Sequence, residues 1–185
     1  MGYFFEDEYS LEDILRSSRM TINVTDFLNP AANKKIRDLL QNLLGRMGRF
    51  FNIERGALSF LDAQNEKMHI SHMLKNGHIN TGVTLVIKNK SSIMYQTLDH
   101  GFPVADNFPE HISSSTIEKK ILTSDATRSV LMIPLITDSV RIGVLSLSSR
   151  DECAFGTYLE GVGKGFVDDF ADRLYQMFTA GKIAV

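Results

Sequence analysis

The feature that most constrains the fold is a pair of apolar runs separated by two polar residues. Residues 129–137 (SVLMIPLIT) and 141–149 (RIGVLSLSS) flank Asp138 and Ser139. Aliphatic runs around a short polar pair predict an antiparallel β-hairpin. Pro134 cannot donate a hydrogen bond to a neighbouring strand, so we expect a free edge or a bulge there. The chain should therefore contain an antiparallel sheet.

Helical periodicity lies on both sides of this strand region. Asn29 followed by Pro30 suits the N-cap and first turn of a helix, and apolar residues then recur with a period near 3.6 through residue 51. A capping pattern also predicts a short helix over 10–18. The last helix is predicted to carry its apolar side chains over 155–177 on one side.

Between these helices the sequence predicts further strands and short helices. The strands are predicted at 56–62, 67–74, 83–87 and 103–106, and the short helices at 91–100 and 116–122. Helices at both ends of an antiparallel strand region predict the α+β class, with the helices on one face. We expect a helix and link over 1–28, one domain over 29–180 and a tail over 181–185.

The composition excludes several classes of partner. Hydrophobic residues make up 43% of the chain, charged residues 23%, and the net charge is −2. This charge gives no reason to expect a nucleic acid or an anionic membrane as partner. No apolar run approaches the length that spans a bilayer, and no secretory signal precedes the first helix. We expect a cytoplasmic protein, or the cytoplasmic part of a longer one.

The glycine-rich stretch at 161–165 (GVGKG) has two possible interpretations. A phosphate-binding P-loop needs the pattern GxxxxGK[ST], but Tyr158 occupies the first glycine position and Gly165 the last. The apolar spacing therefore favours a helix in which Gly161 and Gly165, four apart, share a face. Two explanations remain open: tight packing on the domain's own N-terminal helix, or a contact between two copies.

The histidines give no metal site. His69 and His72 are three apart on a predicted strand, so their side chains should point to opposite faces unless a bulge intervenes. His78, His100 and His111 are scattered through predicted loops and helix ends. No pattern identifies a haem ligand, so the cofactor stays unknown.

Three stretches resemble GAF domains. They are LLGRMGRFFNIERGALSFLD at 43–62, HGFPVADNF at 100–108, and TRSVLMIPLITDSVRIGVLSLSS at 127–149 with a following Ala-Phe. The resemblance covers roughly 31–178. It implies a GAF/PAS-like central six-stranded antiparallel sheet, with N- and C-terminal helices on one face and a loop-covered small-molecule pocket on the other.

The resemblance also implies a function, since GAF domains are mostly regulatory. We expect a non-catalytic sensory domain in signal transduction that binds a small anionic metabolite. It would form a homodimer through its terminal helices, with Gly161 and Gly165 at the interface. It would act on an output protein that is either linked to it or separate. The alternatives are a ligand-free dimerisation module and a reductase-like enzyme using Cys153, whose single thiol cannot both attack and resolve. The sequence therefore predicts no enzyme.

The predicted binding site centres on the polar segment 107–127. Four consecutive hydroxyls precede a helix start there, where free N–H groups and the helix dipole suit a phosphate or carboxylate. A plain solvated loop is the alternative. The predicted ligand-binding residues, including apolar walls from the sheet, are Phe60, Met73, Asp106, Phe108, Ser113, Ser114, Ser115, Thr116, Leu131 and Ile133.

Overall fold

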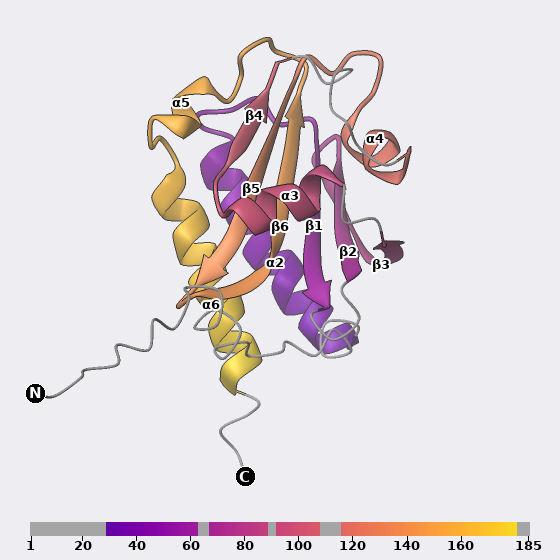
Figure 1. Cartoon of the computed structure of the whole chain (residues 1–185), viewed down its shortest axis with the longest axis vertical. Helices are drawn as coiled ribbons and strands as arrows, with labels where there is room; N and C mark the ends of the chain where they lie inside the picture. The colour runs from indigo at the N-terminus through magenta and orange to yellow at the C-terminus, as the bar shows by residue number, and fades with distance from the viewer. Residues whose placement is uncertain (1–28, 63–66, 89–91, 108–115, 181–185) are drawn as a thin grey trace, which may run out of the picture.

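The computed structural model describes residues 29–62, 67–88, 92–107 and 116–180 (Figure 1). The helix predicted over 10–18 and the predicted tail lie outside these residues. The described elements are α2 (Pro30–Met47), β1 (Arg55–Asp62), β2 (Lys67–Lys75), β3 (His78–Ile87), α3 (Ile93–His100), β4 (Val104–Asp106), α4 (Thr116–Leu122), β5 (Ser129–Thr137), β6 (Val140–Ser149), α5 (Gly156–Leu159) and α6 (Lys164–Ala180).

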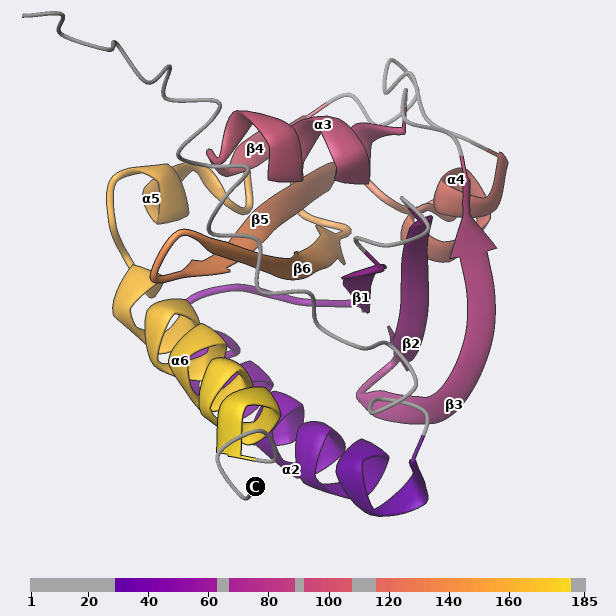
Figure 2. The same ribbon diagram turned by 60° about the horizontal axis from the view of Figure 1, so that its bottom comes forward.

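The strands form one six-stranded sheet in the order β3-β2-β1-β6-β5-β4, and every neighbouring pair is antiparallel. The predicted α+β class and six-stranded sheet are confirmed. Helices α2 and α6 cover one face of this sheet, while α3 and α4 cover the other (Figure 2). We call these the α2/α6 face and the α3/α4 face.

The predicted hairpin is β5 and β6. Asp138 and Ser139 both adopt positive φ, 49° and 63°. A two-residue hairpin turn needs positive φ at both positions if its twist is to match that of the two strands. Pro134 pairs with Val144 on β6, and the register shifts directly after Leu135. On its other side, β5 pairs with β4 only over 130–132. The proline thus lies beside a bulge and a free edge, as predicted.

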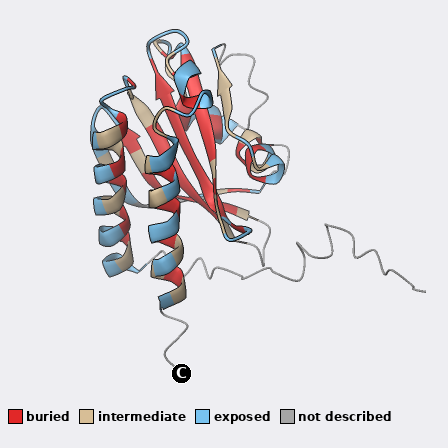
Figure 3. Cartoon of the chain, turned by 90° about the vertical axis from the view of Figure 1, so that its left-hand side faces the viewer, coloured by how far each residue is buried: buried red, intermediate tan, exposed pale blue. Residues whose placement is uncertain are grey.

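Helix α2 begins where the sequence predicts. The side chain of Asn29 accepts a hydrogen bond from the Ala31 amide at 2.9 Å, and Pro30 occupies the first turn. The helix ends at Met47 rather than at residue 51, because the chain turns at Gly48. In Figure 3 the two long helices turn their buried residues toward the sheet and their exposed residues outward.

The prediction of one unbroken C-terminal helix is wrong. The chain forms α5, a turn over 160–163, and then α6, with Gly161 and Gly163 at φ values of 108° and 80°. These left-handed conformations suit glycine and end a helix. Gly161 and Gly165 therefore do not share one helix face. The close approach to α2 is made by Gly163, where an added Cβ would lie 3.1 Å from the Met47 sulfur.

The prediction that His69 and His72 point to opposite faces is also wrong. Leu58 and Phe60, two apart on β1, pair with His72 and His69 respectively, because the register shifts between them. One extra residue in β2, Ser71, restores both imidazoles to the α2/α6 face. Sequence spacing could not reveal this bulge.

Candidate functional site

Three of the predicted pocket residues lie on the α2/α6 face. Phe60, Leu131 and Ile133 belong to the core under the terminal helices, and the Phe60 ring lies 6.0 Å from that of Phe178 on α6. Their placement in a pocket on the opposite face was wrong. Side chains alternate along a strand, and no local pattern assigns odd and even positions to one face or the other.

The other predicted residues divide between the α3/α4 face and segments without description. Met73 packs against the core cluster beneath α3 and α4, and Asp106 ends β4. Thr116 is the exposed first residue of α4. Phe108 and Ser113–Ser115 lie outside the described residues.

Two rows of cross-strand partners form the floor of the α3/α4 face. Directly paired residues of antiparallel strands point to the same side of the sheet. From β4 to β2, the rows are Asp106, Val130, Ser148, Arg55 and Lys75, and Val104, Met132, Ser146, Ala57 and Met73. Met73 and Asp106 therefore flank the same surface, with two serines and an arginine between them.

The centre of this floor holds three donors without partners. The hydroxyls of Ser146 and Ser148 and the Nε of Arg55 are buried, and none makes a hydrogen bond. Both serines have no exposed surface. Buried polar groups are nearly always hydrogen-bonded, so such a cluster requires an explanation. By contrast, the neighbouring hydroxyl of Ser59 donates to the Val144 carbonyl at 3.1 Å.

Arg55 is held at the edge of this cluster. One terminal nitrogen donates to the Thr123 carbonyl after α4 at 3.2 Å, and Nε lies 4.0 Å from the Glu54 carboxylate. The hydrogen bond that Arg150 donates to Glu54 at 2.9 Å lowers the pKa of that carboxyl. Glu54 is thus engaged mainly by Arg150, and the Arg55 Nε–H remains a donor without an acceptor.

The two covering helices are fastened to each other. Ser92 caps α3 by accepting a hydrogen bond from the Tyr95 amide, and Gly101 ends the helix at φ 72°. The fully buried Glu118 of α4 accepts from the Met94 amide of α3 at 3.1 Å. A carboxylate at a helix N-terminus is stabilised by the free N–H groups and the helix dipole. A change that moves α4 should therefore also move α3.

Three of the ten described buried residues in the core cluster of this face are methionines. Met68, Met94 and Met132 are fully buried in the cluster under α3 and α4, and Met73 packs at its edge. Methionine is unbranched and flexible, so it adapts its shape more readily than leucine or isoleucine. Because Ser146 and Ser148 have no exposed surface, a ligand can reach their hydroxyls only after the side chains that cover them move.

An open groove lies on the far side of α2 and α6 from the sheet. Its volume is about 960 Å³, and it runs from Asn29 to Arg46 along α2 and from Phe166 to Ala180 along α6. The Arg46 guanidinium lies 4.0 Å from the centre of the Phe166 ring and donates to Asp169. This groove is separate from the floor described above.

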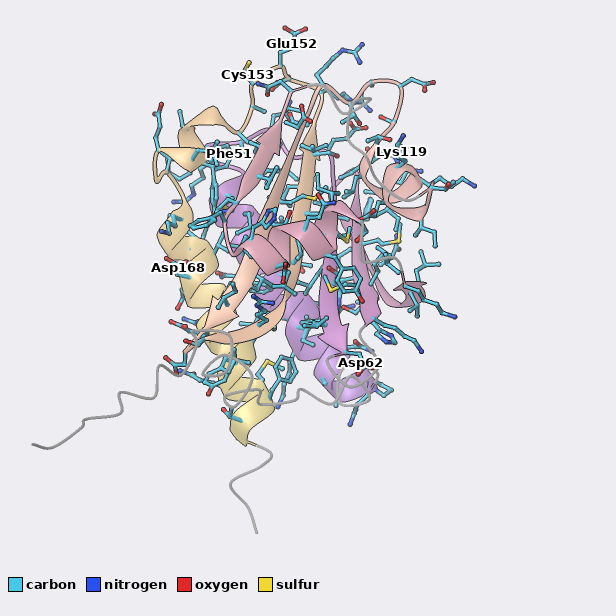
Figure 4. All side chains as sticks on the ribbon, viewed as in Figure 1. Phe51, Asp62, Lys119, Glu152, Cys153 and Asp168 are labelled. Atoms are coloured by element: carbon cyan, nitrogen blue, oxygen red, sulfur yellow. The ribbon has the colours of Figure 1, made fainter. Side chains whose placement is uncertain are left out.

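Cys153 lies apart from both surfaces. It is exposed, adopts a positive φ of 54°, and projects with Glu152 from the loop between β6 and α5 (Figure 4). Within the part of the chain that the structure describes, no group of three His, Cys, Asp or Glu side chains could hold a metal ion. Among the described helices, none is both long and apolar enough to cross a membrane.

Sequence reasoning missed Arg55, Ser146, Ser148 and Glu118. A signal for the serines existed in the alternation of LSLSS at 145–149, where small hydroxyls occupy every second position of a buried strand. No comparable signal marked Arg55 or Glu118, because their burial depends on helices distant in sequence.

The fold is similar to solved structures of GAF domains. That of a two-component sensor histidine kinase from Bacillus halodurans is 19% identical, with TM-score 0.61, covering 78% of this chain and 97% of that one. That of a phosphoenolpyruvate-protein phosphotransferase from Coxiella burnetii is 16% identical, with TM-score 0.60 and coverages of 92% and 96%. Neither protein-family models nor curated proteins give a match. At these identities the similarity shows the fold alone.

Enzymes are also among the similar structures. The type II free methionine-R-sulfoxide reductase from Thermoplasma acidophilum is 15% identical, with TM-score 0.58, covering 79% of this chain and 96% of that one. The reductase from Neisseria meningitidis is similar too. The expectation that this chain is not an enzyme is therefore overturned, since the same fold carries catalysis in these proteins.

Proposed function

Because the chain has the fold of GAF domains, we propose that it is a regulatory domain that binds a small oxyanion-bearing metabolite on the α3/α4 face of its sheet. One observation carries this proposal: the unpartnered donors of Arg55, Ser146 and Ser148 lie together under α3 and α4. A carboxylate or phosphate would accept hydrogen bonds from all three. The guanidinium adds charge, which makes such bonds shorter and stronger.

Strand β6 offers a route from the ligand to the terminal helices. On β6, Ser146 and Ser148 alternate with Leu145 and Leu147, which pack in the core under α2 and α6. A ligand that moves the serines therefore also moves the floor of the opposite face. It shifts the balance between two states only by its difference in affinity for them.

A ligand panel with three serine variants tests the site. The thermal unfolding of the full chain is measured with pyruvate, with L-methionine and with inorganic phosphate. We expect one of these oxyanions to raise Tm, because a ligand that binds only the folded state stabilises it by about 2.7 kcal/mol at a hundredfold excess over Kd. Ser146→Ala and Ser148→Ala should abolish the rise.

Ser59→Ala is the matched control, since its hydroxyl lies on the same face but is already bonded to the Val144 carbonyl. It should leave the response intact. An equal response in all three variants, or no response of the unaltered protein to any of the three probes, would contradict the proposal.

The second candidate function is association of two copies, with or without a ligand. Phe50 is 54% exposed and lies against Phe166, next to Gly165, while Leu159 is 55% exposed two residues before Gly161. Exposed apolar side chains beside glycines suit a close contact between two copies of the chain. This corner at the α5–α6 turn is where we place the homodimer contact that the glycines led us to expect.

Sedimentation tests this contact. Phe50→Glu should convert a dimer to a monomer, whereas Phe102→Glu, at a side chain 72% exposed on the loop after α3, should not. A Phe50→Glu variant that sediments like the unaltered protein contradicts the contact. The cytoplasmic setting and an output protein, linked or separate, stay predictions from the sequence.

A further inference from the structure

The groove between α2 and α6 combines apolar walls with positive charge. Leu39, Phe166 and Met177 contribute apolar surface along its length. The groove lining holds more cations than carboxylates. The cations are Lys35, Arg46 and Arg173, and the carboxylates are Asp38 and Asp169. An amphipathic segment with acidic side chains would complement both the apolar walls and the positive charge of this surface.

The carboxylates of the groove are already engaged. Asp169 accepts hydrogen bonds from Arg46 at 3.3 Å and from Arg173 at 3.1 Å, and Asp38 lies 3.6 Å from Arg37. Lys35 is exposed. The groove therefore presents positive charge to whatever occupies it.

The chain itself contains a segment of complementary chemistry. Residues 1–18 hold five carboxylates against one arginine, a net charge of −4, so the total of −2 leaves +2 for the rest. Apolar residues accompany these charges at Tyr3, Phe4 and Phe5, and again at Leu11, Ile14 and Leu15 with helical spacing.

The connection is long enough for this segment to reach the groove. The chain enters α2 at Asn29, which lines one end of the groove. The ten residues 19–28 span up to about 33 Å when extended. The 18 residues of α2 span roughly 27 Å. Residues 1–18 can thus lie along any part of the groove.

We propose that the acidic amphipathic segment 3–18 binds in the groove between α2 and α6 of its own chain. Its apolar side chains cover Leu39, Phe166 and Met177, and its carboxylates pair with Lys35 and Arg173. This docking requires no ligand on the opposite side of the sheet. It makes the outer surface of α2 and α6 an intramolecular interface.

Paramagnetic relaxation in the full chain tests the proposal. A nitroxide is attached at Ser17→Cys in a Cys153→Ser background, and the amides of the ¹⁵N-labelled protein are observed. We expect broadening of Lys35, Leu39, Arg173 and Gln176 on the groove, and none of Lys75 at the far end of β2. Groove amides that stay sharp overturn the proposal.

A mixed sample separates the two possible occupants. Spin-labelled chains without ¹⁵N are combined with ¹⁵N chains without a label. Broadening of the groove in this sample, at the strength seen in the doubly labelled chain, would mean that the segment binds a second copy, and the intramolecular proposal fails. We expect the mixed sample to show no broadening.

Charge reversal then tests the recognition itself. Lys35→Glu with Arg173→Glu should lower the broadening rate about tenfold, because two attractive contacts become repulsive. Lys75→Glu with Lys119→Glu makes the same change in net charge at exposed positions on β2 and α4, outside the groove lining, and should leave the rate unchanged. Figure 4 shows Lys119 on α4, away from α2 and α6. Equal effects of the two pairs would overturn the assignment.

Discussion

On the α2/α6 face of the sheet the buried side chains are almost all apolar, whereas on the α3/α4 face serine hydroxyls and a guanidinium nitrogen lie among methionines. The first face carries aromatic contacts such as Phe60 with Phe178. The second carries flexible thioethers and donors without partners. The difference separates a face suited to stability from one suited to rearrangement and binding.

The largest expected effect tests how rigid the α2/α6 face is. Phe60→Ala should lower the free energy of unfolding by about 3–5 kcal/mol, because it leaves a cavity among side chains that cannot collapse into it. On the other face, Met132→Leu conserves volume and should cost less than about 1.5 kcal/mol. Urea denaturation measures both changes in the free energy of unfolding. If Phe60→Ala lowers it no more than Met132→Leu does, the two faces do not differ in rigidity.

The next effect concerns the turn that brings α6 against α2. Gly163→Ala should destabilise by about 1–3 kcal/mol, because its φ is 80° and the new Cβ would meet Met47 and Phe51. Gly165→Ala is the control, since nothing lies within 4 Å of its Cβ and the residue is helical. It should stabilise by about 1 kcal/mol. Thermal unfolding of a dilute sample should give opposite shifts in Tm.

A buried histidine should make the α2/α6 face sensitive to acid. His72 lies between the Asn33 carbonyl on α2, 3.2 Å from Nε2, and the Ser71 hydroxyl, 2.7 Å from Nδ1. Burial lowers its pKa, and nearby Arg37 lowers it further, against the opposing effect of the Asn33 carbonyl.

The unfolded chain therefore binds a proton at His72 more readily than the folded chain does. The contribution of His72 to stability is complete above its unfolded pKa of about 6.5 and is lost as pH falls through that value toward the lower folded pKa. The loss approaches about 1.4 kcal/mol for each unit between the two values. Denaturation at several pH values should show this slope. His72→Gln should flatten it, and His78→Gln, at an exposed position, should not.

The smallest effect compares two hydroxyls on the α3/α4 face. Ser59→Ala removes a hydrogen bond to the Val144 carbonyl and should cost about 1 kcal/mol. Ser146→Ala removes a buried hydroxyl without a partner and should be neutral or slightly stabilising in the absence of ligand. Equal losses, measured by urea denaturation, would mean that Ser146 is satisfied in the free protein.

Local signals predicted most of the elements but little of the site. The cap at Asn29, the turn at Asp138-Ser139 and the short helix over 116–122 follow from neighbouring residues, and all three are confirmed. The face of each strand does not follow from neighbours. Phe60, Leu131 and Ile133 were therefore placed on the wrong side, and Met73 on the correct one only because the bulge at Ser71 lies where it does.

The sequence by itself determined most of the stretches that are helix or strand, because hydrophobic period, caps and turn residues act over a few positions. The break between α5 and α6 was not among them. Only the tertiary structure decided that Arg55, Ser146 and Ser148 come together, and that Glu118 joins α4 to α3. Strand register and burial depend on contacts between residues far apart in the chain, and no local pattern encodes them.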